Sequence, residues 1–334
     1  MLTTRFTKLV GCTVPLQEAG MGQLGTPRLA AAVSDAGGLG MVGVSGAPAE
    51  YVAKALEEVR RLTSGVFGAN FTVPSMVDDV TGKLDPGMAA ALEEAASRAR
   101  VVEFFYADPE PSLVERVHAG GALACWQVGY RDEAIAAERA GCDLIVAQGV
   151  EAGGHVRGKT GLLALLGEVL PVVHVPVVAA GGIGTGRAMA AGLSAGASAV
   201  RVGTRFVAAA ESDAHPRYVE RLIAAEAKDT VLTEAFSANW PNAPHRVLRS
   251  CVEAMEREKT ETVGERVYAW APHDRVPVRR ADSMVPMRTT TGNIDAMPHW
   301  AGESVTAVKV IQPAGEIVRE LAEEAERLLR QWES

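Results

Sequence analysis

The chain has 334 residues, 48% of them hydrophobic, which is enough for one large α/β domain or two smaller ones. Its formal net charge of −8 argues against a polyanionic partner such as nucleic acid. Its four cysteines are widely spaced and fit neither a disulfide framework nor a zinc site. Because neither a signal-peptide core nor an apolar run of transmembrane length occurs, we expect a cytoplasmic protein without membrane association.

Strand-like and helix-like segments alternate along the first two thirds of the chain at the spacing of βα units. The predicted strands lie at 14–19, 39–44, 65–73, 101–106, 122–128, 143–147, 177–180 and 199–203. The predicted helices lie between them, at 27–36, 48–62, 88–98, 112–118, 132–140 and 162–169. This alternation indicates an α/β protein with a (β/α)₈ TIM barrel. A doubly wound sheet is less favoured, because the candidate site residues follow many strands and not one switch point.

The pattern changes after the last predicted strand. We assign the barrel to residues 1–210 and a helical and irregular cap region over the barrel mouth to residues 211–310. Within that region, helices are expected at 216–232 and 244–258, whereas 264–303 is rich in Pro, Gly, Arg and Met and lacks periodicity, as a lid would. Residues 311–334 are expected to form an amphipathic helix that packs back on the barrel.

Two glycine-containing loops follow the seventh and eighth predicted strands. The first runs from Gly181 to Gly186 and opens a helix, and the second contains Gly203, Thr204 and Arg205. Backbone N–H groups at a helix start favour a phosphate, and barrel enzymes commonly bind phosphate in these two loops. The sequence therefore predicts a phosphate site formed by N–H groups, the Thr204 hydroxyl and the charge of Arg205. Tight turns that close the barrel would explain either loop taken alone.

The stretch from Gln148 to His155 follows the sixth predicted strand. Its glycines let the backbone approach a ligand closely, and a histidine at its end can exchange protons near neutral pH. From the residue types alone, catalysis by His155 and a plain role such as helix capping are equally open. The other histidines, including His245 in the late region, are not expected to compete for the role.

Polar amides end three of the predicted strands: Asn70 the third, Gln127 the fifth and Gln148 the sixth. A buried amide needs hydrogen-bond partners, so each either contacts a ligand or is a satisfied core group. Their position at three different strand ends favours a polar ligand in the barrel mouth. The glycine-rich loop 17–22 offers backbone for a flat ring system, but by itself it is better explained as a loop packed on its neighbour.

Several other functional motifs are not present in the sequence. The spacing of the glycines at 181–186 is wrong for a dinucleotide fingerprint, and the sequence contains neither a P-loop nor a nucleophile elbow. No pair of histidines has metal-ligand spacing, so we expect no metal site.

Three motifs together resemble the nitronate monooxygenase family, formerly called 2-nitropropane dioxygenases. They are Glu-Ala-Gly-Gly-His at 151–155, Ala-Ala-Gly-Gly-Ile at 179–183 and Val-Gly-Thr-Arg-Phe at 202–206. The resemblance covers about residues 5–215, and the rest of the chain more loosely. The same superfamily contains flavin-dependent enoyl-acyl-carrier-protein reductases and NADH:quinone reductases.

The resemblance implies a barrel that holds one FMN and oxidises alkyl nitronates with O₂ to a carbonyl compound and nitrite. His155 matches the catalytic histidine of the family, with a pKa near 7. There it would either remove the α-proton of a nitroalkane or steady an anionic substrate. By motif position, the residues implied in FMN binding are Ala19, Gly20, Met21, Asn70, Gln127, Gln148, Gly153, Gly181, Gly182, Gly203 and Thr204.

The chain departs from the family pattern in two places. Residues 17–21 read Gln-Glu-Ala-Gly-Met, where many relatives have Gln-Gly-Gly-Met or Ala-Pro-Met, and Gln127 replaces a lysine or serine of some relatives. Two alternatives stay open: an NAD(P)H-dependent FMN reductase of enoyl thioesters or quinones, and a flavin-binding barrel without turnover. The expected partners are a small-molecule substrate and O₂, with NAD(P)H in the reductase alternative. Oligomerisation is left open.

Overall fold

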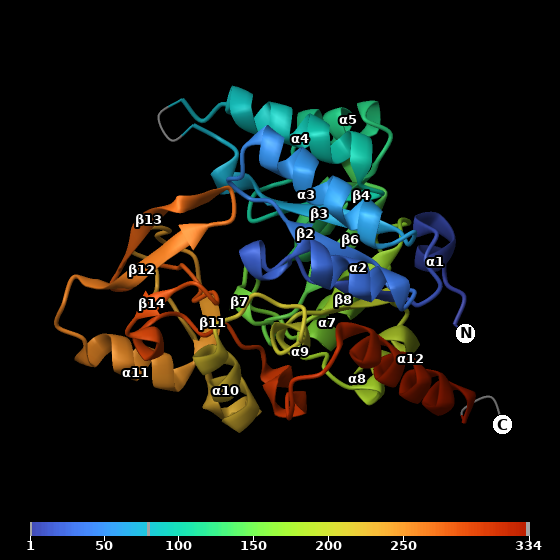
Figure 1. Ribbon diagram of the computed structural model, residues 1–334. Coiled ribbons are helices and arrows are strands. Elements are labelled where there is room, and N and C mark those ends of the chain that lie inside the picture. Colours follow the sequence, from blue (N-terminus) through green and yellow to red (C-terminus); the bar gives the residue numbers. More distant parts are fainter. Residues whose placement is uncertain (1, 79–80, 332–334) are drawn as a thin grey trace.

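The computed structural model describes residues 2–78 and 81–331, and it confirms the barrel (Figure 1). Eight parallel strands follow the order β1-β9-β8-β6-β5-β4-β3-β2. The two strands at the ends of this order, β1 and β2, are joined by a parallel bridge between Gln17 and Leu39, which closes the sheet. The strands are β1 (Leu16–Glu18), β2 (Gly40–Gly43), β3 (Phe67–Thr72), β4 (Val101–Phe105), β5 (Leu123–Val128), β6 (Leu144–Gln148), β8 (Val177–Ala180) and β9 (Ala199–Val202).

Most residues of the strands are apolar because both faces of the sheet are covered, one by the barrel interior and the other by helices. Side chains of Met41, Val101 and Leu144 pack together inside the barrel, near the amino-terminal ends of the strands. The first helix, α1 (Arg5–Val10), adds Phe6 to the same cluster, so it closes that end of the barrel interior.

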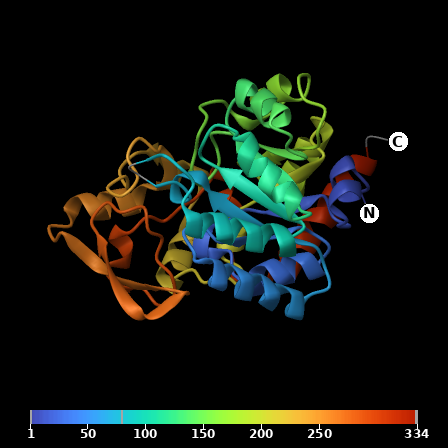
Figure 2. The same ribbon diagram turned by 90° about the horizontal axis from the view of Figure 1, so that it is seen from above.

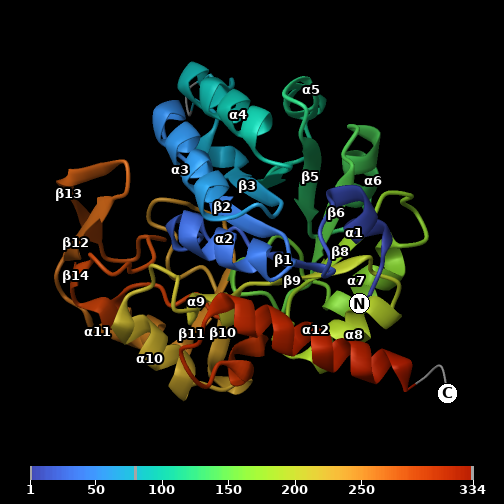
Figure 3. The same ribbon diagram turned by 45° about the vertical axis from the view of Figure 1, so that its right-hand side comes forward.

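The outer layer consists of helices that alternate with the strands. They are α2 (Pro27–Asp35), α3 (Ala49–Leu62), α4 (Pro86–Arg98), α5 (Pro111–Ala119), α6 (Arg131–Arg139), α7 (Leu162–Val169) and α8 (Gly186–Ser194). A short helix, α9 (Thr204–Val207), follows β9, and the last helix, α12 (Ala314–Arg330), packs between α8 and α2 (Figure 3). The buried face of α12 contains Ile317, Val318 and Leu321, as its amphipathic pattern predicts.

Residues 211–312, here called the cap, lie to one side of the barrel, where they are drawn mainly in yellow, orange and red (Figures 1 and 2). Two helix predictions in this region are too long, because α10 (Pro216–Ala224) ends early and α11 (Arg249–Arg257) begins late. The remaining residues form the antiparallel strands β10 (Thr230–Thr233) and β11 (His245–Leu248). Their β-branched residues favour a strand over a helix.

The expectation of an irregular segment at 264–303 is also wrong in part. A hairpin of β12 (Thr262–Tyr268) and β13 (Ala271–Arg279) occupies its first half, and β14 (Thr291–Gly292) pairs with β12. Interruptions in the register of the hairpin and its exposed β13 strand weaken the period-two pattern that would have revealed it.

A small three-stranded sheet connects the cap to the barrel. The barrel loop after β6 contains β7 (Gly154–His155), which pairs antiparallel with β11 in the sheet β10-β11-β7. His245 of β11 lies opposite His155 in this register.

None of the helices among the described residues has the length and apolar character of a membrane span.

Candidate active site

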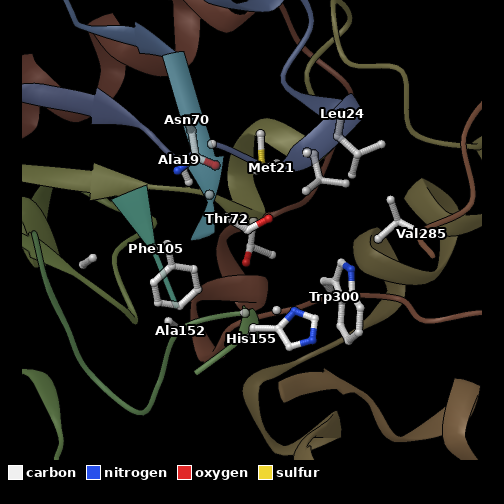
Figure 4. Close-up of a pocket in the computed structure, with 18 of the residues that line it drawn as sticks. Ala19, Met21, Leu24, Asn70, Thr72, Phe105, Ala152, His155, Val285 and Trp300 are labelled. Carbon is white, nitrogen blue, oxygen red and sulfur yellow. The ribbon is translucent and has the colours of Figure 1, made fainter. Parts of the chain in front are cut away.

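A cavity of about 380 Å³ lies at the carboxyl ends of the barrel strands, with the cap along one side (Figure 4). The carboxyl-terminal ends of the eight barrel strands and the loops that follow them form the barrel side of the cavity. Tyr218, Trp240 and Trp300 belong to the cap side. The cavity brings together the catalytic candidate and all the residues implied in FMN binding, namely Ala19, Gly20, Met21, Asn70, Gln127, Gln148, Gly153, His155, Gly181, Gly182, Gly203 and Thr204. Their individual roles stay predictions.

The loops after β8 and β9 differ in backbone shape and in contacts. Gly181 and Gly182 have φ values of +115° and +68°, a conformation that side chains rarely adopt. The Thr204 hydroxyl accepts a hydrogen bond from the Gly302 amide at 2.9 Å, and its own O–H remains able to donate to a ligand. Arg205 does not line the cavity. It donates to Gly184 O at 3.0 Å and also contacts α12, so the prediction that it adds charge at this site is wrong.

Gly153 has a packing role that sequence reasoning did not foresee. A Cβ at this position would lie 2.4 Å from the backbone nitrogen of Gly302 in the cap. The absence of a side chain therefore lets the cap approach the loop after β6 closely, while Gly153 still lines the cavity.

The strand-end amides rest on a buried ion pair between Glu103 of β4 and Arg201 of β9. Asn70 donates through Nδ2 to Glu103 at 2.7 Å, Gln17 donates to the same carboxylate at 2.8 Å, and Gln127 accepts from Arg201. These contacts orient the two cavity amides: the Oδ1 of Asn70 and the Nε2 of Gln127 remain for a ligand. Asn70 and Gln127 are therefore satisfied core groups at one end of each amide and remain available for a ligand at the other end.

Glu103 and Arg201 are themselves functional candidates that sequence reasoning missed. Each is a single charged residue within an otherwise apolar strand, Val-Val-Glu-Phe-Phe at 101–105 and Ala-Val-Arg-Val at 199–202. That pattern was the available signal, because a buried charge requires a partner.

Gln148, the third strand-end amide, does not contact this ion pair. It donates to the backbone oxygen of His155 at 3.0 Å and holds that loop.

His155 lies in a box of rings on the cap side of the cavity. Its ring centroid is 4.1 Å from Trp240, 5.2 Å from Trp300 and 5.7 Å from Tyr106 (Figure 4 shows Trp300 beside it). Burial, together with the neighbouring His245, lowers the pKa of His155 to about 3. The expectation of a pKa near 7 is therefore wrong, and the imidazole is neutral at physiological pH. Its Nε2 has no hydrogen-bond partner among the residues that the structure describes.

His245 is closer to the site than its place in the sequence suggested. Its ring centroid is 5.4 Å from that of His155, and both of its nitrogens are engaged by backbone groups. Nε2 accepts from the Phe236 amide at 3.1 Å, and Nδ1 contacts Ala243 O at 2.8 Å. Because Nε2 is an acceptor, the contacts fix the neutral Nδ1–H tautomer. His245 is thus a neutral partner that shapes the surroundings of His155.

The fold and this cavity define a (β/α)₈-barrel enzyme whose binding site lies at the carboxyl rim of the strands. The model of the nitronate monooxygenase family matches residues 3–324. The chain belongs to this family, which makes it an oxidoreductase and confirms the resemblance seen in the motifs.

The chain is also similar to individual relatives and solved structures. A probable nitronate monooxygenase of Staphylococcus aureus strain JH9 is 34% identical over 271 residues, which cover 70% of this chain and 76% of the relative. The structure of FabK from Thermotoga maritima is similar with a TM-score of 0.80 and 30% identity, over 100% of this chain and 99% of that one. Nitroalkane oxidase from Streptomyces ansochromogenes is similar with a TM-score of 0.77 and 29% identity, over 99% and 100% of the two chains.

Proposed function

We propose that the protein binds FMN and oxidises alkyl nitronates with O₂. The observation that carries the proposal is the cavity itself. Its lining includes glycine loops suited to a phosphate and a neutral histidine whose Nε2 has no partner in the described part of the chain. In this proposal Gly181, Gly182, Gly203 and Thr204 bind the phosphate of FMN. The other contacts come from Ala19, Gly20, Met21, Gly153 and the free ends of Asn70 and Gln127.

The residues present fit such a group. The left-handed glycines provide a close backbone approach, and the amides offer one acceptor and one donor oriented by the ion pair below them. When bound, FMN would supply the redox chemistry between the substrate and O₂. The overall reaction balances when two nitronates and one O₂ give two carbonyl compounds and two nitrite ions.

The state of His155 favours a nitronate over a neutral nitroalkane. With a pKa of about 3, the imidazole is a weak proton acceptor and is poorly suited to remove an α-proton. A nitronate needs no such step because it has already lost that proton. The proposed role of His155 is to hydrogen-bond the anionic nitro group from Nε2, beside the rings of Trp240 and Trp300.

The deciding experiment measures O₂ uptake and nitrite release by the FMN-loaded protein with ethyl nitronate and, separately, with nitroethane. We expect turnover of the nitronate without NADH and much slower turnover of nitroethane. His155→Gln should keep its FMN and lose nitronate activity. A protein that cannot be reconstituted with FMN, or that uses both substrates equally, would contradict the proposal.

The second candidate is an NAD(P)H-dependent reductase of enoyl thioesters or quinones. The observation in its favour is that FabK aligns over the whole chain as well as nitroalkane oxidase does. Anaerobic NADH and NADPH oxidation with crotonyl-CoA or a benzoquinone separates the two functions. Rapid acceptor-dependent oxidation without nitronate turnover would establish the reductase.

A further inference from the structure

One buried cation at the cavity forms no direct ion pair with any residue that the structure describes. Arg266 of β12 is 4% exposed and lines the cap side of the cavity. Its guanidinium carbon lies 4.6 Å from the centroid of the Tyr268 ring, and Nη2 contacts the Met287 sulfur at 3.3 Å. Its Nε has no hydrogen-bond partner in the described part of the chain. A thioether is a weak acceptor, so the guanidinium retains most of its donor capacity.

Two other buried arginines, Arg201 and Arg246, are compensated differently. Arg201 is paired with Glu103, and Arg246 lies 3.2 Å from Glu303. Among residues 2–78 and 81–331, by contrast, no carboxylate lies within 4.0 Å of Arg266. The neighbouring acidic side chain, Asp213, lies 3.8 Å from Arg288 and acts on Arg266 only through space, at more than 4.0 Å.

An unpaired buried charge is costly, and a guanidinium remains charged at any physiological pH. A cost of this kind is offset when a ligand brings the opposite charge into the same cavity. The guanidinium lies over the Tyr268 ring, and its planar set of N–H donors suits the oxygens of a carboxylate or a phosphate.

We propose that Arg266 and Tyr268 form an anion subsite on the cap side of the cavity. This subsite binds an oxyanion group that the bound molecule carries away from its reacting end. The inference rests on the proposed function, which places the reacting end at His155. The oxyanion has two candidate sources: a carboxylate on the nitronate substrate, or the diphosphate of NAD(P)H.

The test compares two nitronates on the FMN-loaded protein, one prepared from 1-nitrobutane and one from 4-nitrobutanoate. The second differs by a carboxylate in place of the terminal methyl group. Arg266→Met should lower kcat/KM for the carboxylated nitronate about 10- to 100-fold, the usual effect of losing a charged hydrogen bond. It should change the value for the uncharged nitronate by less than about threefold, and Arg266→Lys should fall between.

The matched control is Arg275→Met in the adjacent strand of the same hairpin. The Arg275 side chain is 60% exposed and pairs with Glu265 at 3.5 Å, so its loss should affect neither nitronate. In a second arm, NADH and NADPH oxidation is measured with both variants. An effect of Arg266→Met confined to the dinucleotides assigns the subsite to their diphosphate, and one confined to the carboxylated nitronate assigns it to the substrate.

Three results would overturn the subsite: loss of FMN from Arg266→Met, equal losses on both nitronates, or no change in either arm. If the wild-type protein oxidises neither nitronate and no dinucleotide, the proposed function itself has failed. The subsite is then judged by calorimetric titration with succinate and inorganic phosphate. Binding of either anion that disappears in Arg266→Met supports the subsite, and unchanged or absent binding refutes it.

Discussion

The buried ion pair between Glu103 and Arg201 lies under the cavity. Removing one partner should destabilise the protein by more than the intact pair contributes to its stability, because the other charge is left buried. Replacing Arg201 with methionine removes the bond to Glu103 and the bond to Gln127, and it leaves a fully buried carboxylate. Breaking a buried pair costs about 3–5 kcal/mol. Two donors, Gln17 at 2.8 Å and Asn70 at 2.7 Å, still satisfy the carboxylate. We therefore expect the lower end, a loss of about 3 kcal/mol in the free energy of unfolding.

Equilibrium urea unfolding of Arg201→Met, Glu103→Gln and the double variant measures this directly. Glutamine keeps an acceptor oxygen but removes the negative charge, so the double variant no longer contains an unpaired charge. Its loss of stability should be smaller than the sum of the two single losses by about 2 kcal/mol. Single losses below about 1 kcal/mol, or losses that add within about 0.5 kcal/mol, would refute the reasoning.

Three further predictions concern the cap and its contact with the barrel. Gly153→Ala should destabilise the protein and weaken FMN binding, because its Cβ would meet cap backbone at 2.4 Å; Gly167→Ala, with open space around its Cβ, is the control and should be neutral or stabilising in thermal unfolding. Trp270→Ala should speed proteolytic cleavage of the β12–β13 hairpin, because the Trp270 ring packs the hairpin against α3, with its centroid 5.4 Å from that of Tyr51. An unchanged cleavage rate would contradict this. The pKa of His155 is about 3 when folded and near 6.5 when unfolded, so stability should fall as the pH drops from about 6.5 toward 3. Urea midpoints at pH 7 and 5 should show a smaller drop for His155→Gln than for the wild-type protein.

The barrel could be predicted from the sequence because its signals are local. Apolar runs such as Leu144–Gln148, followed by glycine and then an amphipathic segment, identify each βα unit without knowledge of its neighbours. The site followed from the same logic, since the ends of parallel strands meet at one rim and their loops must share a cavity.

The cap could not be predicted in the same way, because its strands depend on partners that are distant in sequence. The segment His245–Leu248 is a strand because it pairs with Thr230–Thr233 on one side and with Gly154–His155 on the other. The pKa of His155 has the same origin. The rings that bury it come from Tyr106, Trp240 and Trp300, and no local pattern connects them.

The position of α12 affects how the protein is made. The ring of helices has its last place between α8 and α2, and the helix that fills it, Ala314–Arg330, is translated after the entire cap. A nascent chain therefore carries a nearly complete barrel with an open apolar seam while some hundred further residues are synthesised. The time spent in this state, and not the stability of the finished protein, should set its demand for chaperones during expression.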